Sequence, residues 1–234
     1  MGASNTQGFS LDECPGAGEH SYVRMNQLHA PTSTPTRLLD AAEHLFAMAG
    51  YAGASVRAVA ASAGADLGSV RYHFGSKAGL FGAVLRRRVE PLNERRLGEL
   101  ADLEQRAGGR PCDLEALLDA FVTPAFELLT HPVHGADWVK LVARVRLDPE
   151  PFRAAGPSGF QDVIDRYLAA MQRALPDLDA IELRYRWHFF FGAQVNTLVD
   201  AAALRSVVGS ESVGADAEAL KPRLIRFCAA GFRA

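Results

Sequence analysis

The stretch "SVRAVAASAGADLGSVRYHFGSK", Ser55 to Lys77, decides the fold of this chain because it holds two short helical patterns and the residues that begin and end them. Ser55 and Asp66 each precede a pattern, and their side-chain oxygens are suited to accept the unpaired amides of a first helical turn. Gly64, near the end of the first pattern, tolerates the positive φ that ends a helix. The stretch therefore predicts a helix-turn-helix joined through "AGAD".

The second of these helices is expected to present a contact surface. Leu67, Val70 and Phe74 recur at spacings of three and four, which places them on the inner face. An isolated surface helix would carry Lys and Glu on its outer face, but small and polar groups stand there instead: Gly68, Ser69, Arg71, Tyr72 and His73.

The chemistry of these outer residues suits the major groove of DNA. Gly68 and Ser69 are small enough to let the helix backbone approach base edges. Arg71 is suited to a bidentate pair with guanine and equally to a phosphate contact, so both roles stay open.

The flanking residues suit the DNA backbone. Tyr72 and His73 offer groups for sugar and phosphate contacts, the alternative being that they pack on a neighbouring helix. Lys77 and Arg57 lie in the first turns of helices, where unpaired amides already favour an anion, so each is expected to help hold a phosphate.

The charge distribution supports a polyanionic partner. Residues 34–89 carry seven Lys/Arg against three Asp/Glu, a balance of +4, although the chain as a whole has a net charge of −2. The balances are −2 for residues 1–33 and −4 for residues 90–234. Only one segment is basic, and a localised positive surface favours binding to nucleic acid.

The rest of the chain is expected to be all-α. Residues 1–33 are rich in Gly, Ser and polar residues and predict a flexible tail. No alternating strand pattern appears, and about nine helices are expected. Their approximate ranges are 34–50, 55–64, 66–75, 77–107 with a kink at Pro91, 112–130, 136–147, 159–174, 178–204 and 215–231.

Composition excludes several classes of protein. The 234 residues are 48% hydrophobic, which is enough for a full core. Three unclustered cysteines offer neither a disulfide framework nor a zinc site and fit a reducing cytoplasm, and neither a membrane span nor a signal peptide is expected. An enzyme would depend on His131 and His134 with Asp137, or on a cysteine nucleophile, but no cofactor or metal motif is evident.

The run Thr36 to Phe81 resembles the N-terminal DNA-binding domain of the TetR family of transcriptional regulators. The resemblance lies in "AAEHLF", "GY", "SVRAVA", "AG" and "YHFGSK" at these separations. It implies a helix-turn-helix domain at 34–80, followed at 81–234 by a helical domain for effector binding and dimerisation. Leu67 and Arg71 depart from the family pattern, so no base preference can be transferred.

By the family motif, the positions that face DNA are Arg57, Gly68, Ser69, Arg71, Tyr72, His73 and Lys77. The resemblance also implies a homodimer in which the last two helices pair with their copies. The apolar side chains expected at that interface are Trp187, Phe191, Leu198, Leu220, Leu224 and Phe227, together with Gln194. The alternative is that these faces pack only within their own chain.

An effector cavity is expected among the helices of the C-terminal half. Its candidate lining residues are Phe121, Phe126, Trp138, Leu141, Tyr167 and Phe189, with Arg184, Arg186 or His188 as further polar anchors. For each of these, a place in the ordinary core is the alternative. The segment Arg86 to Glu104 is similar to a subgroup that includes regulators responsive to fatty acids and xenobiotics, which favours an apolar or amphipathic effector.

The sequence thus predicts a cytoplasmic repressor that a small molecule releases from a palindromic operator. A DNA-organising protein without an effector shares every N-terminal feature and remains an alternative, as does, less favourably, an enzyme.

Overall fold

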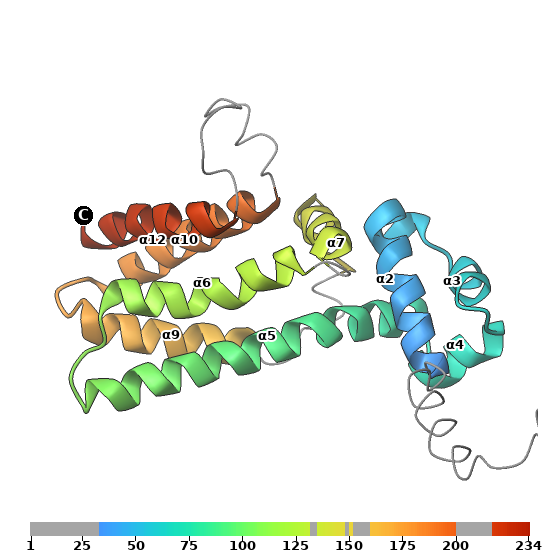
Figure 1. The fold of residues 1–234 in the computed structure, drawn as a ribbon, viewed down its shortest axis with the longest axis horizontal. Coiled ribbons are helices and arrows are strands. Elements are labelled where there is room, and N and C mark those ends of the chain that lie inside the picture. Colours follow the sequence, from blue (N-terminus) through green and yellow to red (C-terminus); the bar gives the residue numbers. More distant parts are fainter. Residues whose placement is uncertain (1–32, 132–134, 148–149, 152–159, 200–216) are drawn as a thin grey trace, which may run out of the picture. The chain divides into compact units, whose positions relative to one another are not determined.

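The computed structural model describes residues 33–131, 135–147, 150–151, 160–199 and 217–234, and within these ranges the only regular elements are helices (Figure 1). The described helices are α2 (Thr34–Gly53), α3 (Val56–Ser62), α4 (Leu67–Phe74), α5 (Lys77–Ala107), α6 (Leu114–Thr130), α7 (Gly135–Leu147), α9 (Phe160–Ala174), α10 (Ala180–Val199) and α12 (Ala217–Arg233). The predicted all-α class, with about nine helices, is confirmed for this part of the chain. Residues 1–32 of the tail expected at 1–33, together with the expected helical residues 159, 200–204 and 215–216, lie outside the described residues.

Three side-chain caps begin the helices of the predicted helix-turn-helix region and the long helix that follows. The oxygen of Ser55 accepts the amide of Ala58 at 3.0 Å, that of Asp66 accepts Ser69 at 2.7 Å, and that of Ser76 accepts Gly79 at 3.0 Å. Each bond satisfies one of the amides that a first turn leaves unpaired. Local sequence therefore begins α3, α4 and α5 where it was expected to.

The first helix differs from its prediction at Gly50. The sequence predicts that the helix stops there, and Gly50 does adopt a positive φ of 73° that interrupts the helical geometry. The chain then resumes helical hydrogen bonding as far as Gly53, so α2 is longer than expected. Gly50 is thus a break inside α2.

Two hydrophobic cores share the long helix α5. The first joins α2, α3, α4, α7 and α5 up to Val89, and includes Trp138 and Leu141 of α7. The second joins the later part of α5 to α6, α9, α10 and α12. Figure 1 shows α5 running from the α2–α4 region to the α6 and α9 region. Residues 34–234 form one compact unit. The first core extends beyond residue 80, the predicted end of the helix-turn-helix domain, into α5 and α7.

Candidate functional site

The exposed face of α4 is organised by its cap, Asp66. The Ser69 amide and hydroxyl donate to the two Asp66 carboxylate oxygens at 2.7 and 2.9 Å, and these hydrogen bonds hold the pKa of Asp66 below its usual value. A Cβ at Gly68 would lie 2.9 Å from Asp66 Oδ1, so the absence of a side chain also serves the cap. The first turn of α4 is therefore fixed before any partner binds.

The remaining outer side chains of α4 point to solvent. Arg71, Tyr72 and His73 are exposed, and Tyr72 is 85% accessible. The Tyr72 and His73 rings meet edge to face with centroids 4.9 Å apart. Both therefore remain available to a partner molecule, and the alternative that they are buried on a neighbouring helix does not describe this structure.

Lys77 and Arg57 differ in their surroundings. Lys77 Nζ donates to the Ala52 carbonyl at 3.3 Å and lies 4.7 Å from the centroid of the Tyr51 ring. Arg57 is exposed in the first turn of α3. Lys77 is thus anchored to the end of α2, whereas Arg57 extends into solvent.

An open depression of about 400 Å³ lies between α3, α4 and the start of α5. It is lined by Val56, Leu67, Gly68, Val70, Arg71, Gly75, Ser76 and Lys77.

A largely apolar cavity of about 200 Å³ lies where the two cores meet. Three helices, α5, α7 and α10, and one residue of α6 line it, and the residues of α5 are spaced by four, three and four. The lining residues are Leu85, Val89, Leu92 and Arg96 of α5, Ala125 of α6, Trp138, Leu141, Val142 and Val145 of α7, and Phe191, Gln194, Val195 and Leu198 of α10.

This lining differs from the one that the sequence predicts for an effector cavity. Trp138 and Leu141 do line the cavity. Phe121, Phe126 and Tyr167 instead belong to the second core, where Phe121 contacts the rings of Tyr167 and Trp187. A stripe of aromatic residues at helical spacing fits a core and a cavity equally well, so periodicity alone did not separate them.

The polar anchors expected for this site lie elsewhere. Arg184 and His188 are exposed on α10, and Arg184 faces Asp165 at 4.0 Å. Arg186 donates to the carbonyls of Gly231 and Phe232, near the end of α12, at 3.2 and 3.0 Å. None of the three lines the cavity.

Arg96 is the charged residue that lines the cavity, and it was not among the residues predicted from the sequence. Its side chain is buried, with 2% of the residue accessible. Nε donates to the Phe121 carbonyl at 2.9 Å, and the guanidinium carbon lies 3.8 Å from the centroid of the Phe121 ring. Burial lowers the pKa of Arg96 to about 10, so it stays charged at neutral pH. A signal was present, because Arg96 continues the inner-face spacing of Leu85, Val89 and Leu92.

Two buried amide side chains accompany Arg96. Gln194 lines the cavity and is 1% accessible, and its Oε1 has no hydrogen-bond partner among the residues that the structure describes. Asn93 precedes Arg96 by one turn of α5, and within the same described ranges neither its Oδ1 nor its Nδ2 has a partner. Buried polar atoms without a partner are uncommon in native proteins and call for an explanation.

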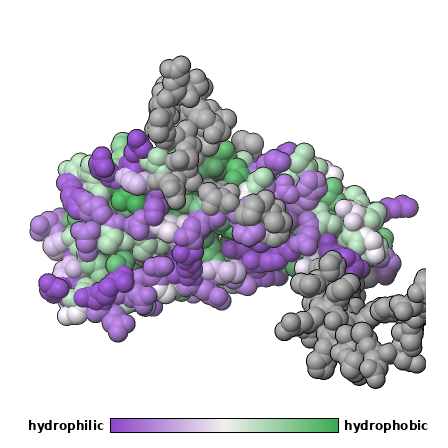
Figure 2. Space-filling model, in the orientation of Figure 1, coloured by the Kyte–Doolittle hydropathy of each residue, from purple (hydrophilic) through white to green (hydrophobic). Residues whose placement is uncertain are grey.

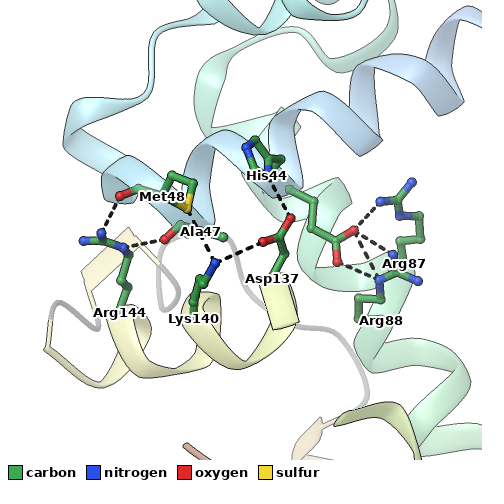
Figure 3. A network of polar contacts seen from close by, with 9 residues as sticks. His44, Ala47, Met48, Arg87, Arg88, Asp137, Lys140 and Arg144 are labelled. Carbon is green, nitrogen blue, oxygen red and sulfur yellow. Dashed lines mark hydrogen bonds and ion pairs between the residues drawn. The ribbon is translucent and has the colours of Figure 1, made fainter. Parts of the chain in front are cut away.

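Helix α7 connects the cavity to α2 (Figure 3). Arg144 Nε donates to the Ala47 carbonyl at 2.7 Å, and Nη2 of the same side chain donates to the Met48 carbonyl. These carbonyls lie in the last turn before the break at Gly50. Asp137 Oδ2 forms a hydrogen bond with His44 Nδ1 of α2 at 2.9 Å. One helix therefore both lines the cavity and docks on the helix-turn-helix unit.

An apolar surface covers part of α10 and α12. Ile181, Tyr185 and Phe189 recur every four residues on α10 and are exposed, and Phe227 on α12 is 74% accessible. Figure 2 shows hydrophobic residues among the polar ones over the end of the molecule that carries these two helices. Exposed apolar residues gathered in this way are typical of association surfaces.

The side chains expected at a dimer interface are distributed differently by the structure. Phe227 lies on this exposed surface, and Leu220 is half-buried. Trp187, Gln194 and Leu224 are buried within their own chain. Phe191 and Leu198, like Gln194, line the cavity. Helix α10 is apolar on two faces, and Trp187 and Gln194, both predicted for the interface, lie on the face that is buried within the chain.

The described residues contain no group of three His, Cys, Asp or Glu side chains placed to hold a metal. His134, one of the two histidines considered for such a site, lies outside them, and Asp137 is engaged with His44 and Lys140. None of the helices described is long and apolar enough to cross a bilayer.

Comparison with known proteins matches both parts of the chain to one family. Residues 38–84 match the model of bacterial regulatory proteins of the tetR family, and residues 119–231 match the model of the tetracyclin repressor-like C-terminal domain. No curated protein matches the sequence significantly.

Solved structures share the fold. The fatty acid degradation regulator FadR from Bacillus halodurans is similar with a TM-score of 0.59 and 17% identity over 87% of this chain and 98% of its own. A TetR-family regulator from Shewanella sp. PV-4 gives 0.57 and 17% over 86% and 96%, and one from Mesorhizobium loti gives 0.51 and 20% over 86% and 93%. The two family models, the helix-turn-helix and the helical domain behind it lead to one conclusion: the chain belongs to the TetR family of transcriptional regulators.

Proposed function

We propose that this regulator is a dimeric repressor that holds a palindromic operator through α4 and leaves it when a small molecule fills the cavity between the two cores. The observation that carries the proposal is the double role of α7. Trp138 and Leu141 of this helix line the cavity, while Asp137 and Arg144 bind α2. A ligand that moves α7 would therefore move the unit that carries α4.

DNA binding is supported by the surface of α4 and its surroundings. Arg71, Tyr72 and His73 are exposed together, and Arg57 extends from the adjacent α3. In a two-fold dimer, two such helices about 34–36 Å apart would enter successive major grooves. The operator would then be a palindrome.

Dimerisation is supported by the exposed apolar surface of α10 and α12, whose members are Ile181, Tyr185, Phe189 and Phe227. A surface of this kind on the same two helices in both copies gives an isologous, two-fold contact.

Release by an effector requires only a modest coupling free energy between effector binding and DNA binding. A coupling free energy of about 1–3 kcal/mol changes affinity by roughly 5 to 150-fold. The effector must bind one arrangement of α7 and α2 better than the other, because a ligand with equal affinity for both shifts nothing.

Selection of fragmented genomic DNA by the purified protein at near-physiological salt tests the DNA-binding part. Sequencing of the retained fragments should yield a palindrome with half-sites about one helical turn apart. Enrichment without a shared motif would instead support the DNA-organising protein and contradict the repressor.

Two arginine variants separate base reading from phosphate binding. If Arg71 reads guanine, Arg71→Ala should lose roughly 1–3 kcal/mol on the selected operator and much less on scrambled DNA. Arg57→Ala should weaken both and lower the salt slope by about one. Arg106→Ala, an exposed arginine near the end of α5, is the matched control and should change neither. Equal losses for Arg71→Ala on both DNAs would exclude base reading.

A further inference from the structure

Arg96 is a buried cation without an anionic partner. Within the part of the chain that the structure describes, no Asp or Glu forms an ion pair with it, and its hydrogen bond to Phe121 uses only Nε. The neighbouring Arg95, in contrast, pairs with Glu127 and Glu99 on the surface. The two consecutive arginines thus have opposite surroundings.

The burial of the Arg96 charge costs free energy unless an anion pairs with it. Moving a charged side chain out of water costs several kcal/mol after relaxation, and a partner must offset that cost. The contact with the Phe121 ring and carbonyl offsets part of it and fixes the plane of the guanidinium. The two terminal nitrogens remain, and a guanidinium is shaped for a bidentate bond to a planar anion.

The rest of the cavity specifies the body of such an anion. Leu85, Val89, Trp138, Leu141 and Val142 present apolar surface, and Gln194 adds a buried amide with an unpaired oxygen. The volume of about 200 Å³ is below the 300–1,000 Å³ typical of sites for drug-sized ligands. One cation also matches one negative charge better than the two of a phosphate monoester.

We propose that the cavity binds a small carboxylic acid with an apolar body, whose carboxylate pairs with Arg96. The apolar body of the acid then lies against Trp138 and Leu141 of α7, and the unpaired Oε1 of Gln194, which can only accept a hydrogen bond, is not a partner for the carboxylate. This assignment rests on the proposed function, because it makes the acid the effector. It specifies what the sequence left open, the chemical class of the ligand and the residue that recognises it.

Titration calorimetry on the purified full chain without DNA tests the proposal. The probes are butanoate, hexanoate, octanoate and benzoate, each compared with its uncharged amide. At least one acid should bind, and its amide should bind roughly tenfold or more weakly, because a charge-assisted hydrogen bond contributes about 1.5–3 kcal/mol.

Variants assign the preference to Arg96. Arg96→Met should remove the preference for acid over amide, and Arg96→Lys, which keeps the charge, should restore part of it. Arg106→Met removes an exposed arginine from the same helix and should bind the acid as the wild type does. Circular dichroism establishes that each variant is folded. If Arg96→Met does not fold, the comparison of acid and amide on the wild-type chain still decides.

The proposal is overturned if no acid of the series binds, if acid and amide bind equally, or if Arg96→Met retains the preference. A separate measurement of operator binding distinguishes this failure from that of the proposed function. A protein that binds a palindrome but no acid remains a DNA-binding regulator and refutes only the ligand class. A protein that binds the acid but no palindrome refutes the operator.

Discussion

Gly79 is the residue at which the helix-turn-helix has least room. A Cβ at this position would lie 2.1 Å from the carbonyl oxygen of Phe74, and that oxygen belongs to the backbone and has little freedom to move. The approach allows α4 and α5 to meet in the short turn through Gly75 and Ser76. Glycine is thus required here by space.

Gly79→Ala should therefore destabilise the protein by about 1–3 kcal/mol, the usual cost of overpacking. Urea unfolding followed by circular dichroism measures this change. The matched control is Gly98→Ala on the same helix, where a Cβ meets nothing within 4 Å. That substitution should stabilise by roughly 0.5–1 kcal/mol, because alanine loses less backbone entropy in a helix. If both substitutions changed the free energy of unfolding equally, or if Gly79→Ala left it unchanged, the close approach of Gly79 to the Phe74 carbonyl would be contradicted.

Because the Cys228 thiol on α12 is buried, we expect the protein to lose stability in alkali. Burial raises the pKa of its thiol from 9.0 to about 11. Because the folded chain holds this proton more tightly than the unfolded chain, the stabilisation is fully present below pH 9 and is lost as the pH rises through about 11. Tyr167, whose pKa burial also raises, acts in the same direction at higher pH.

Urea unfolding at several pH values between 8 and 11 measures this effect. The free energy of unfolding should fall across the range in the wild-type chain and fall less in Cys228→Ala. Native alkylation with iodoacetamide gives a second measure, since the half-buried Cys112 should react before Cys228. A parallel fall in both proteins would show that the Cys228 thiol does not contribute.

At the scale of elements, Glu43 joins α2 to α5. Its carboxylate is buried with 3% of the residue accessible, and it pairs with Arg87 and Arg88. Nη2 of Arg87 and Nη2 of Arg88 both donate to its Oε2. The contact holds the first helix against the start of the helix that runs through both cores.

Glu43→Gln should cost about 3 kcal/mol, because it removes the carboxylate that pairs with the partly buried Arg88 and leaves Arg87 paired with Asp40 alone. Asp40→Asn is the matched control, since Asp40 pairs with the same Arg87 but is half exposed. An exposed pair contributes about 0–1 kcal/mol, so Asp40→Asn should change stability little. Thermal and urea unfolding of the two variants measure the difference, and equal losses would refute the role of burial.

At the scale of the whole molecule, the apolar surface of α10 and α12 predicts association. Phe189→Glu combined with Phe227→Glu places two charges on exposed apolar positions and should convert a dimer to a monomer in sedimentation velocity experiments. Leu67→Glu, on an exposed apolar residue of α4, is the control and should leave the mass unchanged. A wild-type chain that sediments as a monomer, or a double variant that remains dimeric, would exclude this surface as the interface.

Local sequence by itself determined the helices and the surface of α4. Ser55, Asp66 and Ser76 cap their helices through bonds to residues three positions away, and such contacts depend on neighbours in the chain alone. The spacing of Leu67, Val70 and Phe74 correctly placed Val70 in the core and Phe74 partly inward, but the prediction was wrong for Leu67, which begins α4 and is exposed. The helix-turn-helix was therefore predictable, and with it the family.

Only the tertiary structure decided which face of α10 turns inward and where the cavity lies. This helix is apolar on the face of Trp187 and on that of Phe189, and periodicity does not distinguish two apolar faces. The packing of α10 against α6, α7, α9 and α12 buries the first face and exposes the second. The packing of α5 against α6 places Arg96 beside Phe121, which lies 25 positions later in the sequence, so the charge of the cavity emerges only when distant segments come together.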